Sequence, residues 1–164
     1  MEGDGGGAAV GETYRRYWED FHPGETLSYG EKRVTREEIV EFAREFDPQP
    51  FHLDDAAGAA THFGGLVASG WQSCGFAMRM LVDHVLRDST SMGSPGVKSL
   101  RWLKPVRPGD TLHMHQTTLS TARHPHRRDI GFVNSRFEML NQHDAVVLRM
   151  ESGGMFLLRH PEAP

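Results

Sequence analysis

The sequence of 164 residues lacks the features that define several large classes of protein. It has a single cysteine, Cys74, which excludes an intrachain disulfide and is typical of a reducing compartment. No apolar run reaches the ~18 residues that a membrane-spanning helix requires. The N-terminus also lacks the basic and then apolar layout of a signal peptide. We therefore expect a cytoplasmic protein that does not insert into a membrane.

An excess of basic residues is also missing. The chain has 18 lysines and arginines against 22 aspartates and glutamates, and its formal net charge is -4 at pH 7. The basic residues are spread along the chain, apart from the pair Arg127-Arg128. Because nucleic-acid binding needs a concentrated basic surface, we expect no nucleic-acid partner. Single basic positions remain available to small anionic ligands.

Clusters with metal-ligand spacing are absent as well, although the chain has ten histidines. Four of them form two pairs with i, i+2 spacing, His113 with His115 and His124 with His126. No cysteine or carboxylate pattern stands beside either pair. We interpret these histidines as exposed strand and hairpin positions and predict no metal ion.

The length is that of one domain, and it is sufficient to bury a core without disulfides. Residues 1–13 are rich in glycine and contain almost nothing that packs, so we expect a disordered tail there. The remaining sequence carries continuous signals of regular structure. We predict a single domain over residues 14–160.

The first part of this domain contains extended segments followed by a helix. Residues 17–21 and 27–34 indicate extended structure entering the domain. Thr35 and Glu38 then have the spacing of a capping box in front of an apolar stripe. The pattern predicts a helix that ends at Phe46, because the proline-rich segment after it cannot continue a helix.

A short helix is expected from Asp54, and a second capping box by spacing begins at Ser69. Residues 71–86 follow and are apolar on nearly every side, which predicts a long buried helix. From residue 96 onward the apolar residues alternate with period two, which indicates strands. We predict four of them, at residues 97–103, 111–121, 130–140 and 145–158. With the N-terminal extended segment, they make an α+β protein in which an antiparallel sheet is covered by one long helix.

One short segment carries an acid and an imidazole five positions apart, Asp47 and His52. Pro48 and Pro50 between them lack a backbone N–H and fix φ, so we expect a stiff loop that is not regular helix. An acid and an imidazole held in this way suit proton transfer, which requires an oriented general acid or base. The alternative is a turn whose Asp and His only cap backbone groups.

The start of the long helix is a second candidate for chemistry. Ser69, Gly70 and Trp71 place unpaired amides and the positive end of a helix dipole at this point. Gly70 has no side chain to obstruct a ligand, so its amide is suited to stabilise an oxyanion that develops on a carbonyl oxygen. The alternative is that Ser69 is only a helix cap and Gly70 only a packing requirement.

Three further signals follow one another along the chain: Asp47-Pro48-Gln49-Pro50-Phe51-His52, Phe63-Gly64-Gly65-Leu66-Val67-Ala68-Ser69-Gly70-Trp71 and Leu103-Lys104-Pro105-Val106-Arg107-Pro108-Gly109-Asp110-Thr111. In this order, they resemble segments of the MaoC-like dehydratases and (R)-specific enoyl-CoA hydratases. The first matches the family's Asp-(four residues)-His motif, the second its approach to the central helix, and the third its strand-turn-strand segment. The resemblance extends over about residues 17–158.

The resemblance implies a hotdog fold that dimerises through its sheet edges and binds an acyl thioester of CoA or of a carrier protein. It assigns Asp47 and His52 to the water that adds across a trans-2-enoyl double bond or leaves a 3-hydroxyacyl thioester. It also implies that the Gly70 N–H, in the helix start formed with Ser69 and Trp71, holds the thioester oxygen. No metal or redox cofactor is required, because the thioester itself acidifies its α position.

Basic residues near the third segment are candidate contacts for CoA, namely Arg101, Lys104 and Arg107, with solvated strand positions as the alternative. Two positions depart from the family. Gln49 stands where the family usually has asparagine, and Met78 aligns with a serine that some hydratases carry near the catalytic pair.

Two rival functions remain open on the sequence alone. A hotdog thioesterase usually needs a carboxylate on or near the central helix, and residues 69–82 contain no Asp or Glu. A dimeric acyl-thioester binder without turnover is the second rival, and the intact Asp47 and His52 argue against it.

Overall fold

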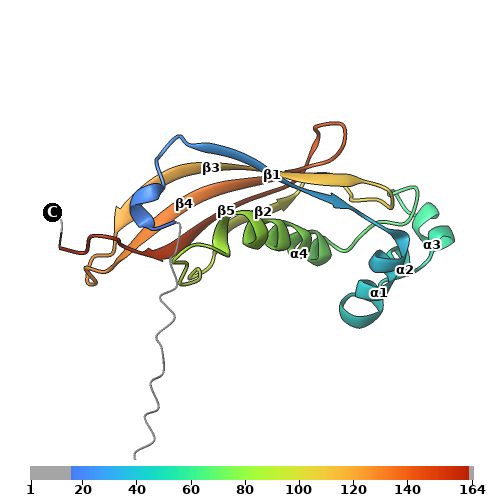
Figure 1. Ribbon diagram of the computed structural model, residues 1–164. Helices are drawn as coiled ribbons and strands as arrows, with labels where there is room; N and C mark the ends of the chain where they lie inside the picture. Colours follow the sequence, from blue (N-terminus) through green and yellow to red (C-terminus); the bar gives the residue numbers. More distant parts are fainter. Residues whose placement is uncertain (1–15, 163–164) are drawn as a thin grey trace, which may run out of the picture.

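The computed structural model describes residues 16–162, so the predicted tail at residues 1–13 lies outside the described part of the chain. Five antiparallel strands form one sheet in the order β1-β3-β4-β5-β2. Figure 1 shows a single helix, α4, lying along one face of this sheet, with α1, α2 and α3 gathered beyond one end of it. The helices are α1 Arg36–Phe46, α2 Pro50–Leu53, α3 Asp55–Ala59 and α4 Gly70–Leu81. The strands are β1 Thr26–Arg33, β2 Val97–Trp102, β3 Thr111–Arg123, β4 Ile130–Leu140 and β5 Val146–Leu157.

The period-two pattern predicted all four C-terminal strands, with ends that differ by no more than two residues. Its physical basis is visible in β3, where every second residue from Leu112 to Thr118 is buried and the residues between them are only partly buried. The core consists of these inward residues and the covering side of α4. Its members include Leu112, Met114, Met139, Val147, Leu148, Ala77, Met80 and Leu81.

The prediction of extended structure at residues 17–21 is wrong in part. Trp18–Asp20 form a 3₁₀ turn, η1, because the carboxylate of Asp20 accepts a hydrogen bond from the Tyr17 backbone N–H at 2.8 Å. The indole N–H of Trp18 also donates to the carbonyl oxygen of Phe132 at 3.0 Å. This turn therefore docks the N-terminal segment on β4, and the first strand begins only at Thr26.

The first predicted helix is confirmed as α1, Arg36–Phe46, including its capping box. The hydroxyl oxygen of Thr35 accepts from the Glu38 backbone N–H, and the Glu38 carboxylate accepts from the Thr35 N–H, both at 3.2 Å. At the other end, the Asp47 N–H donates to the carbonyl oxygen of Ala43 at 3.0 Å. Asp47 is thus the residue on which α1 ends.

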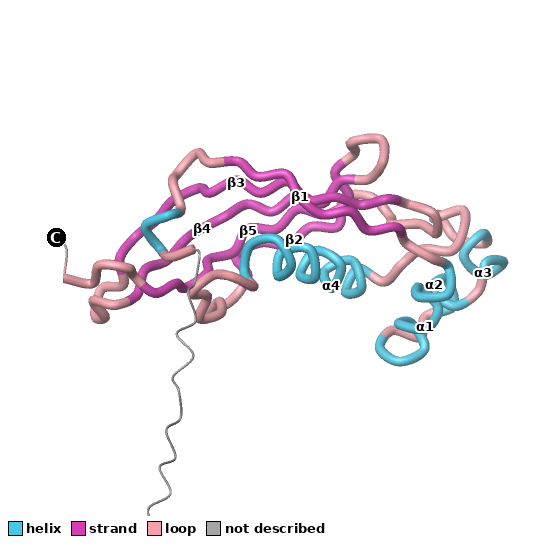
Figure 2. Tube along the Cα trace, viewed as in Figure 1, coloured by secondary structure: helices cyan, strands magenta, loops and turns pink. Residues whose placement is uncertain are grey.

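The long predicted helix comprises α4, Gly70–Leu81, and a π-helical turn η2, Val82–Leu86. The prediction that it is buried on all sides is wrong for this chain. Trp71 is 63% exposed and Met78 50% exposed, because the sheet covers only one side of α4. Figure 2 shows that the opposite side of α4 is not covered by any strand or helix among the described residues. Apolar side chains therefore remain on an uncovered face.

Candidate active site

The segment from Asp47 to His52 is only partly the loop that its prolines predict. Pro50 opens a short helix, α2 Pro50–Leu53, so the prediction that His52 lies outside helical structure is wrong. The reason is that proline is well tolerated at the first position of a helix, where its missing N–H has no partner to lose. The His52 N–H donates to the carbonyl oxygen of Gln49 at 3.0 Å and completes this turn. The result points the His52 side chain back toward Asp47.

The acid and the imidazole lie in direct contact. The Nε2 atom of His52 is 3.3 Å from the Oδ2 atom of Asp47, and the His52 side chain is buried. On the other side of the ring, Nδ1 lies 2.7 Å from the carbonyl oxygen of Val67. A carbonyl oxygen only accepts, so Nδ1 carries the hydrogen. In neutral His52 the lone pair is therefore on Nε2, beside the carboxylate.

Both carboxylate oxygens of Asp47 also accept hydrogen bonds from uncharged donors. Ser69 Oγ donates to Oδ2 at 2.7 Å, and Gln49 Nε2 donates to Oδ1 at 2.8 Å. The Ser69 bond contributes most to a pKa for Asp47 below its ordinary range, partial burial opposes this shift, and Gln49 and the charge of His52 add to it. Asp47 is therefore held as a carboxylate.

The start of α4 is fixed between two other parts of the chain. The Val67 N–H donates to the carbonyl oxygen of Phe51 at 3.3 Å, and the Ala68 N–H donates to that of Val106 at 2.8 Å. These bonds place Ser69, which is fully buried, against Asp47. Its oxygen also accepts from the Trp71 N–H at 3.3 Å, as the capping pattern predicts.

The amides at this helix start are not equivalent. The Trp71 N–H is engaged by Ser69, whereas the Gly70 N–H has no partner among residues 16–162. The carbonyl oxygen of Gly70 accepts from the indole N–H of Trp102 at 2.9 Å. A Cβ atom at Gly70 would lie 2.6 Å from Trp102 Cε2, so packing alone already requires glycine there.

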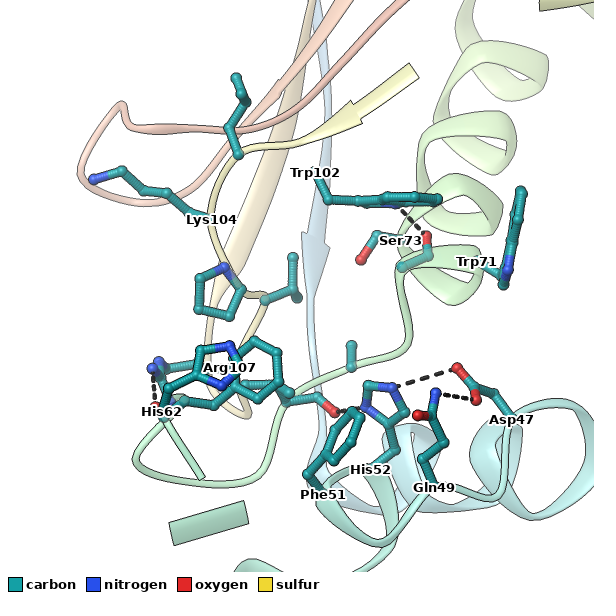
Figure 3. A pocket seen from close by; sticks show the side chains of 17 residues that line it. Asp47, Gln49, Phe51, His52, His62, Trp71, Ser73, Trp102, Lys104 and Arg107 are labelled. Carbon is teal, nitrogen blue, oxygen red and sulfur yellow. Dashed lines mark hydrogen bonds and ion pairs between the residues drawn. The ribbon is translucent and has the colours of Figure 1, made fainter. Parts of the chain in front are cut away.

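A cavity of about 700 Å³ joins these elements, and Figure 3 shows it with Asp47 and His52 on one side and His62 and Arg107 across from them. Of the predicted site residues, six line it. Ser69 lies behind Asp47 rather than on the surface of the cavity, and Arg101 is outside it. The six are Asp47, His52, Gly70, Trp71, Lys104 and Arg107.

The two basic residues that line the cavity, Arg107 and Lys104, differ in how firmly their side chains are held by other residues. Arg107 donates through Nη2 to the carbonyl oxygen of Phe63, which ties its guanidinium to the opposite loop. The same turn is closed by Asp110, whose carboxylate accepts from the Arg107 N–H at 2.8 Å. Lys104 is exposed and forms no ion pair within the described part of the chain. It is therefore the more available contact for an anion.

Among the residues of this cavity that sequence reasoning missed are His62, Ser73 and Trp102. Ser73 is buried and follows Ser69 by one helical turn, so the period of the helix was a usable signal. Trp102 had no local signal, because it reaches α4 only through the pairing of β2 with β5. Its side chain nevertheless packs on Gly70 and lies over Ser73, as Figure 3 shows for Ser73.

A second cavity of about 390 Å³ lies at the other end of α4. Met78, Leu81 and Val85 line one side of it, and residues from the sheet line the other. Met78 does not line the cavity of Asp47 and His52. The position aligned with the hydratase serine thus belongs to a largely apolar space.

Within residues 16–162, no three His, Cys, Asp or Glu side chains are grouped to hold a metal ion. In the same part of the chain, no helix has both the length and the apolarity needed to cross a membrane.

The antiparallel sheet with one long helix on its face is the hotdog fold, as the sequence resemblance implied. The sequence model described as "MaoC like domain" matches residues 20–130. The match covers more than half of the chain, and the protein therefore belongs to the MaoC-like dehydratase domain family.

Relatives and solved structures agree with this assignment. The MaoC-like dehydratase from Rhodospirillum rubrum is 36% identical, with a TM-score of 0.79 over 88% of this chain and 98% of that one. Protein MaoC of Klebsiella aerogenes is 33% identical over 68% of this chain, which spans 34% of that protein's length. The R-hydratase PhaJ1 from Pseudomonas aeruginosa shares the fold, with a TM-score of 0.65 at 23% identity over 90% of this chain and 93% of that one.

Proposed function

We propose that the protein hydrates trans-2-enoyl thioesters to (R)-3-hydroxyacyl thioesters, or catalyses the reverse dehydration. The observation that carries this proposal is the 3.3 Å contact between His52 Nε2 and Asp47 Oδ2 in a cavity that also contains the helix start at Gly70. Membership of the MaoC-like family and the fold shared with R-hydratases support it. The thioester is one of CoA or of an acyl carrier protein.

The geometry suggests which step of the hydration each of the two residues performs. A water molecule beside this pair, within hydrogen-bond reach of both side chains, gives a proton to the lone pair on His52 Nε2 while the carboxylate of Asp47 orients it. The water oxygen bonds to C3, the electrons of the double bond move toward the thioester oxygen, and the Gly70 N–H stabilises that charge. The dyad then returns the proton to C2. Water is thus added without a net change of the protein.

The imidazolium formed in the first step lies next to a carboxylate that is held ionised, which lowers the free energy of that charge. No other carboxylate lines the cavity among the described residues. This is why we assign the proton to His52 and the orientation of the water to Asp47.

A hotdog thioesterase is the second candidate, and one observation favours it more than the sequence did. Residues 69–82 have no carboxylate, but the fold brings Asp47 within 2.7 Å of Ser69 at the start of α4. A water activated there is also within reach of a thioester carbonyl held at Gly70. The two reactions differ in product: hydrolysis releases a thiol, and hydration does not.

We also propose that two chains form the working unit. The exposed side of α4 carries Trp71 and Met78, and the edge strand β2 carries Val97 and Trp102, all at least 47% exposed. An apolar face beside an unpaired strand edge is suited to a second copy, since pairing satisfies the edge and buries the face. In this arrangement Asp47 and His52 of one chain work in a tunnel that the partner helps to wall.

A single assay separates these functions. Purified protein is mixed with a trans-2-enoyl-CoA, and the enoyl absorbance is followed together with a thiol reagent. Loss of the enoyl absorbance without release of thiol supports hydration. Release of thiol with the double bond intact supports the thioesterase. If neither the absorbance nor the thiol changes for any acyl length, on CoA or carrier-protein thioesters, only the role of an acyl-thioester binder without turnover remains.

A further inference from the structure

We propose that Ser69 is a positioning residue that locks the carboxylate of Asp47 to the first turn of α4, and so couples the proton-transfer dyad to the oxyanion site. The sequence assigned Ser69 to the substrate-binding helix start, yet its side chain lies behind Asp47 and does not line the cavity. The inference rests on the proposed role of Asp47 in hydration.

The donors and acceptors around the Ser69 hydroxyl allow only one arrangement of its hydrogen bonds. A serine hydroxyl has one proton, and a carboxylate only accepts, so the 2.7 Å bond to Asp47 Oδ2 uses that proton. The Trp71 N–H then donates to a lone pair of the same oxygen at 3.3 Å. Ser69 has no exposed surface, so bulk water does not compete for either bond. The hydroxyl is oriented from both sides.

The consequence for Asp47 is geometric. Its Oδ2 atom receives the Ser69 hydroxyl and is also the atom nearest to His52 Nε2. Fixing Oδ2 at the helix start therefore fixes the direction from which the carboxylate faces the imidazole and a water bound beside the pair. Gln49 holds the other oxygen, but Gln49 is exposed and water can replace its amide. Ser69 is the donor that water cannot replace.

The charged and titratable groups around Asp47 are few. His52 on α2 faces it directly, and His62, Lys104 and Arg107 line the rest of the cavity. Of these, only His52 contributes to the lowered pKa of Asp47. Loss of the Ser69 hydroxyl should then raise the pKa of the Asp47 carboxyl, since its largest stabilising partner is removed.

The test compares Ser69→Ala with Thr35→Ala. Thr35 caps α1 as Ser69 caps α4, but Thr35 has no contact with Asp47, so it controls for the loss of a helix cap. The Asp47 carboxyl carbon is titrated by NMR in both variants and in the parent protein, which requires no turnover. We expect a higher pKa in Ser69→Ala and no change in Thr35→Ala.

Kinetics supply the second readout. The acid limb of the pH profile of kcat/KM should move to higher pH in Ser69→Ala by the same amount as the NMR titration, and Ser69→Thr, which keeps the hydroxyl, should move it back. An Asp47 pKa that is the same in Ser69→Ala and the parent protein overturns the proposal. The other outcome separates the two proposals. If Ser69→Ala raises the pKa of Asp47 but the parent protein hydrates no enoyl thioester, the positioning role of Ser69 is supported and the proposed function is refuted. Should Ser69→Ala fold poorly, Ser69→Gly serves as the second truncation, because glycine is tolerated at a helix N-cap.

Discussion

The indole N–H of Trp102 donates to the carbonyl oxygen of Gly70 at 2.9 Å, which joins the last residue of the edge strand β2 to the first residue of α4. This bond and the close packing of the indole on Gly70 set the height of the cavity above the helix start. The proposed oxyanion site is therefore built by the sheet as well as by the helix.

Replacing Gly70 by alanine tests this relationship. The new Cβ atom would lie 2.6 Å from Trp102 Cε2, so the indole or the helix start must shift. We expect a loss of hydratase activity of about tenfold or more, because the removal of one oxyanion donor costs roughly 10²–10³ in other enzymes and a shift weakens the same contact. Enoyl-CoA turnover measures it.

Gly75 provides the matched control, since it lies in the same helix and a Cβ there meets nothing within 4 Å in this chain. Gly75→Ala should raise the free energy of unfolding by up to about 1 kcal/mol, the difference in helix propensity. Equal activity of Gly70→Ala and Gly75→Ala would show that the Trp102 contact is not needed.

The dyad predicts two variants that fold but lose turnover. Asp47→Asn removes the charge that faces His52, and His52→Gln removes the Nε2 lone pair. Each should reduce kcat by roughly 10²–10⁴-fold, the usual contribution of an oriented acid or base. Circular dichroism and the thermal midpoint establish that the variants fold. Full activity in either one would exclude the mechanism proposed above.

Lys104, the exposed basic residue that lines the cavity, predicts a change in KM for CoA substrates but not for substrates without the CoA phosphates. Lys104→Ala should raise the KM for an enoyl-CoA by up to about fivefold, the value of one exposed ion pair, and should leave an enoyl-N-acetylcysteamine thioester unaffected. Arg101→Ala is the control, because Arg101 is exposed on β2 but does not line the cavity. The same KM for CoA substrates in all three proteins would remove Lys104 from the site.

The second cavity predicts the acyl-chain preference. Met78 is half exposed and lines this apolar space at the far end of α4, about 12 Å along the helix from Gly70 at 1.5 Å per residue. If the acyl chain follows the helix, Met78→Ala should shift the optimum of kcat/KM to longer chains. A series of trans-2-enoyl-CoA substrates measures the shift, and an unchanged optimum places the chain elsewhere.

The proposed dimer predicts the effect of a charge at the sheet edge. Val97 begins the edge strand β2 and is 54% exposed, so Val97→Glu would place a carboxylate in the interface and favour single chains. Leu119→Glu is the control, because Leu119 is an exposed apolar residue on β3, an inner strand of the sheet. Sedimentation should find dimers for the parent and Leu119→Glu. A monomeric parent with full activity would contradict the shared tunnel.

Much of the fold was predictable because its signals are local. The capping box of Thr35 and Glu38 lies within four residues, and the alternation in β3 repeats every two. The contact of Asp47 with His52 is also local, spanning five positions, so the sequence alone indicated the dyad.

The remaining features depend on parts of the chain that are distant in sequence. The bond from Ser69 to Asp47 spans 22 residues and that from Trp102 to Gly70 spans 32, and no periodicity reports either one. The same holds for the uncovered face of α4, since a helix apolar on all sides has the same pattern whether a strand or a second chain covers it.

The sequence by itself therefore determined the order of the elements and the five-residue spacing of Asp47 and His52, because capping, alternation and proline act between near neighbours. The tertiary structure alone decided which side chains hold that dyad in place and which wall of the cavity is built by the sheet. Those contacts arise only when packing brings α1, α4 and β2 together, and only then does the carboxylate of Asp47 meet the hydroxyl of Ser69.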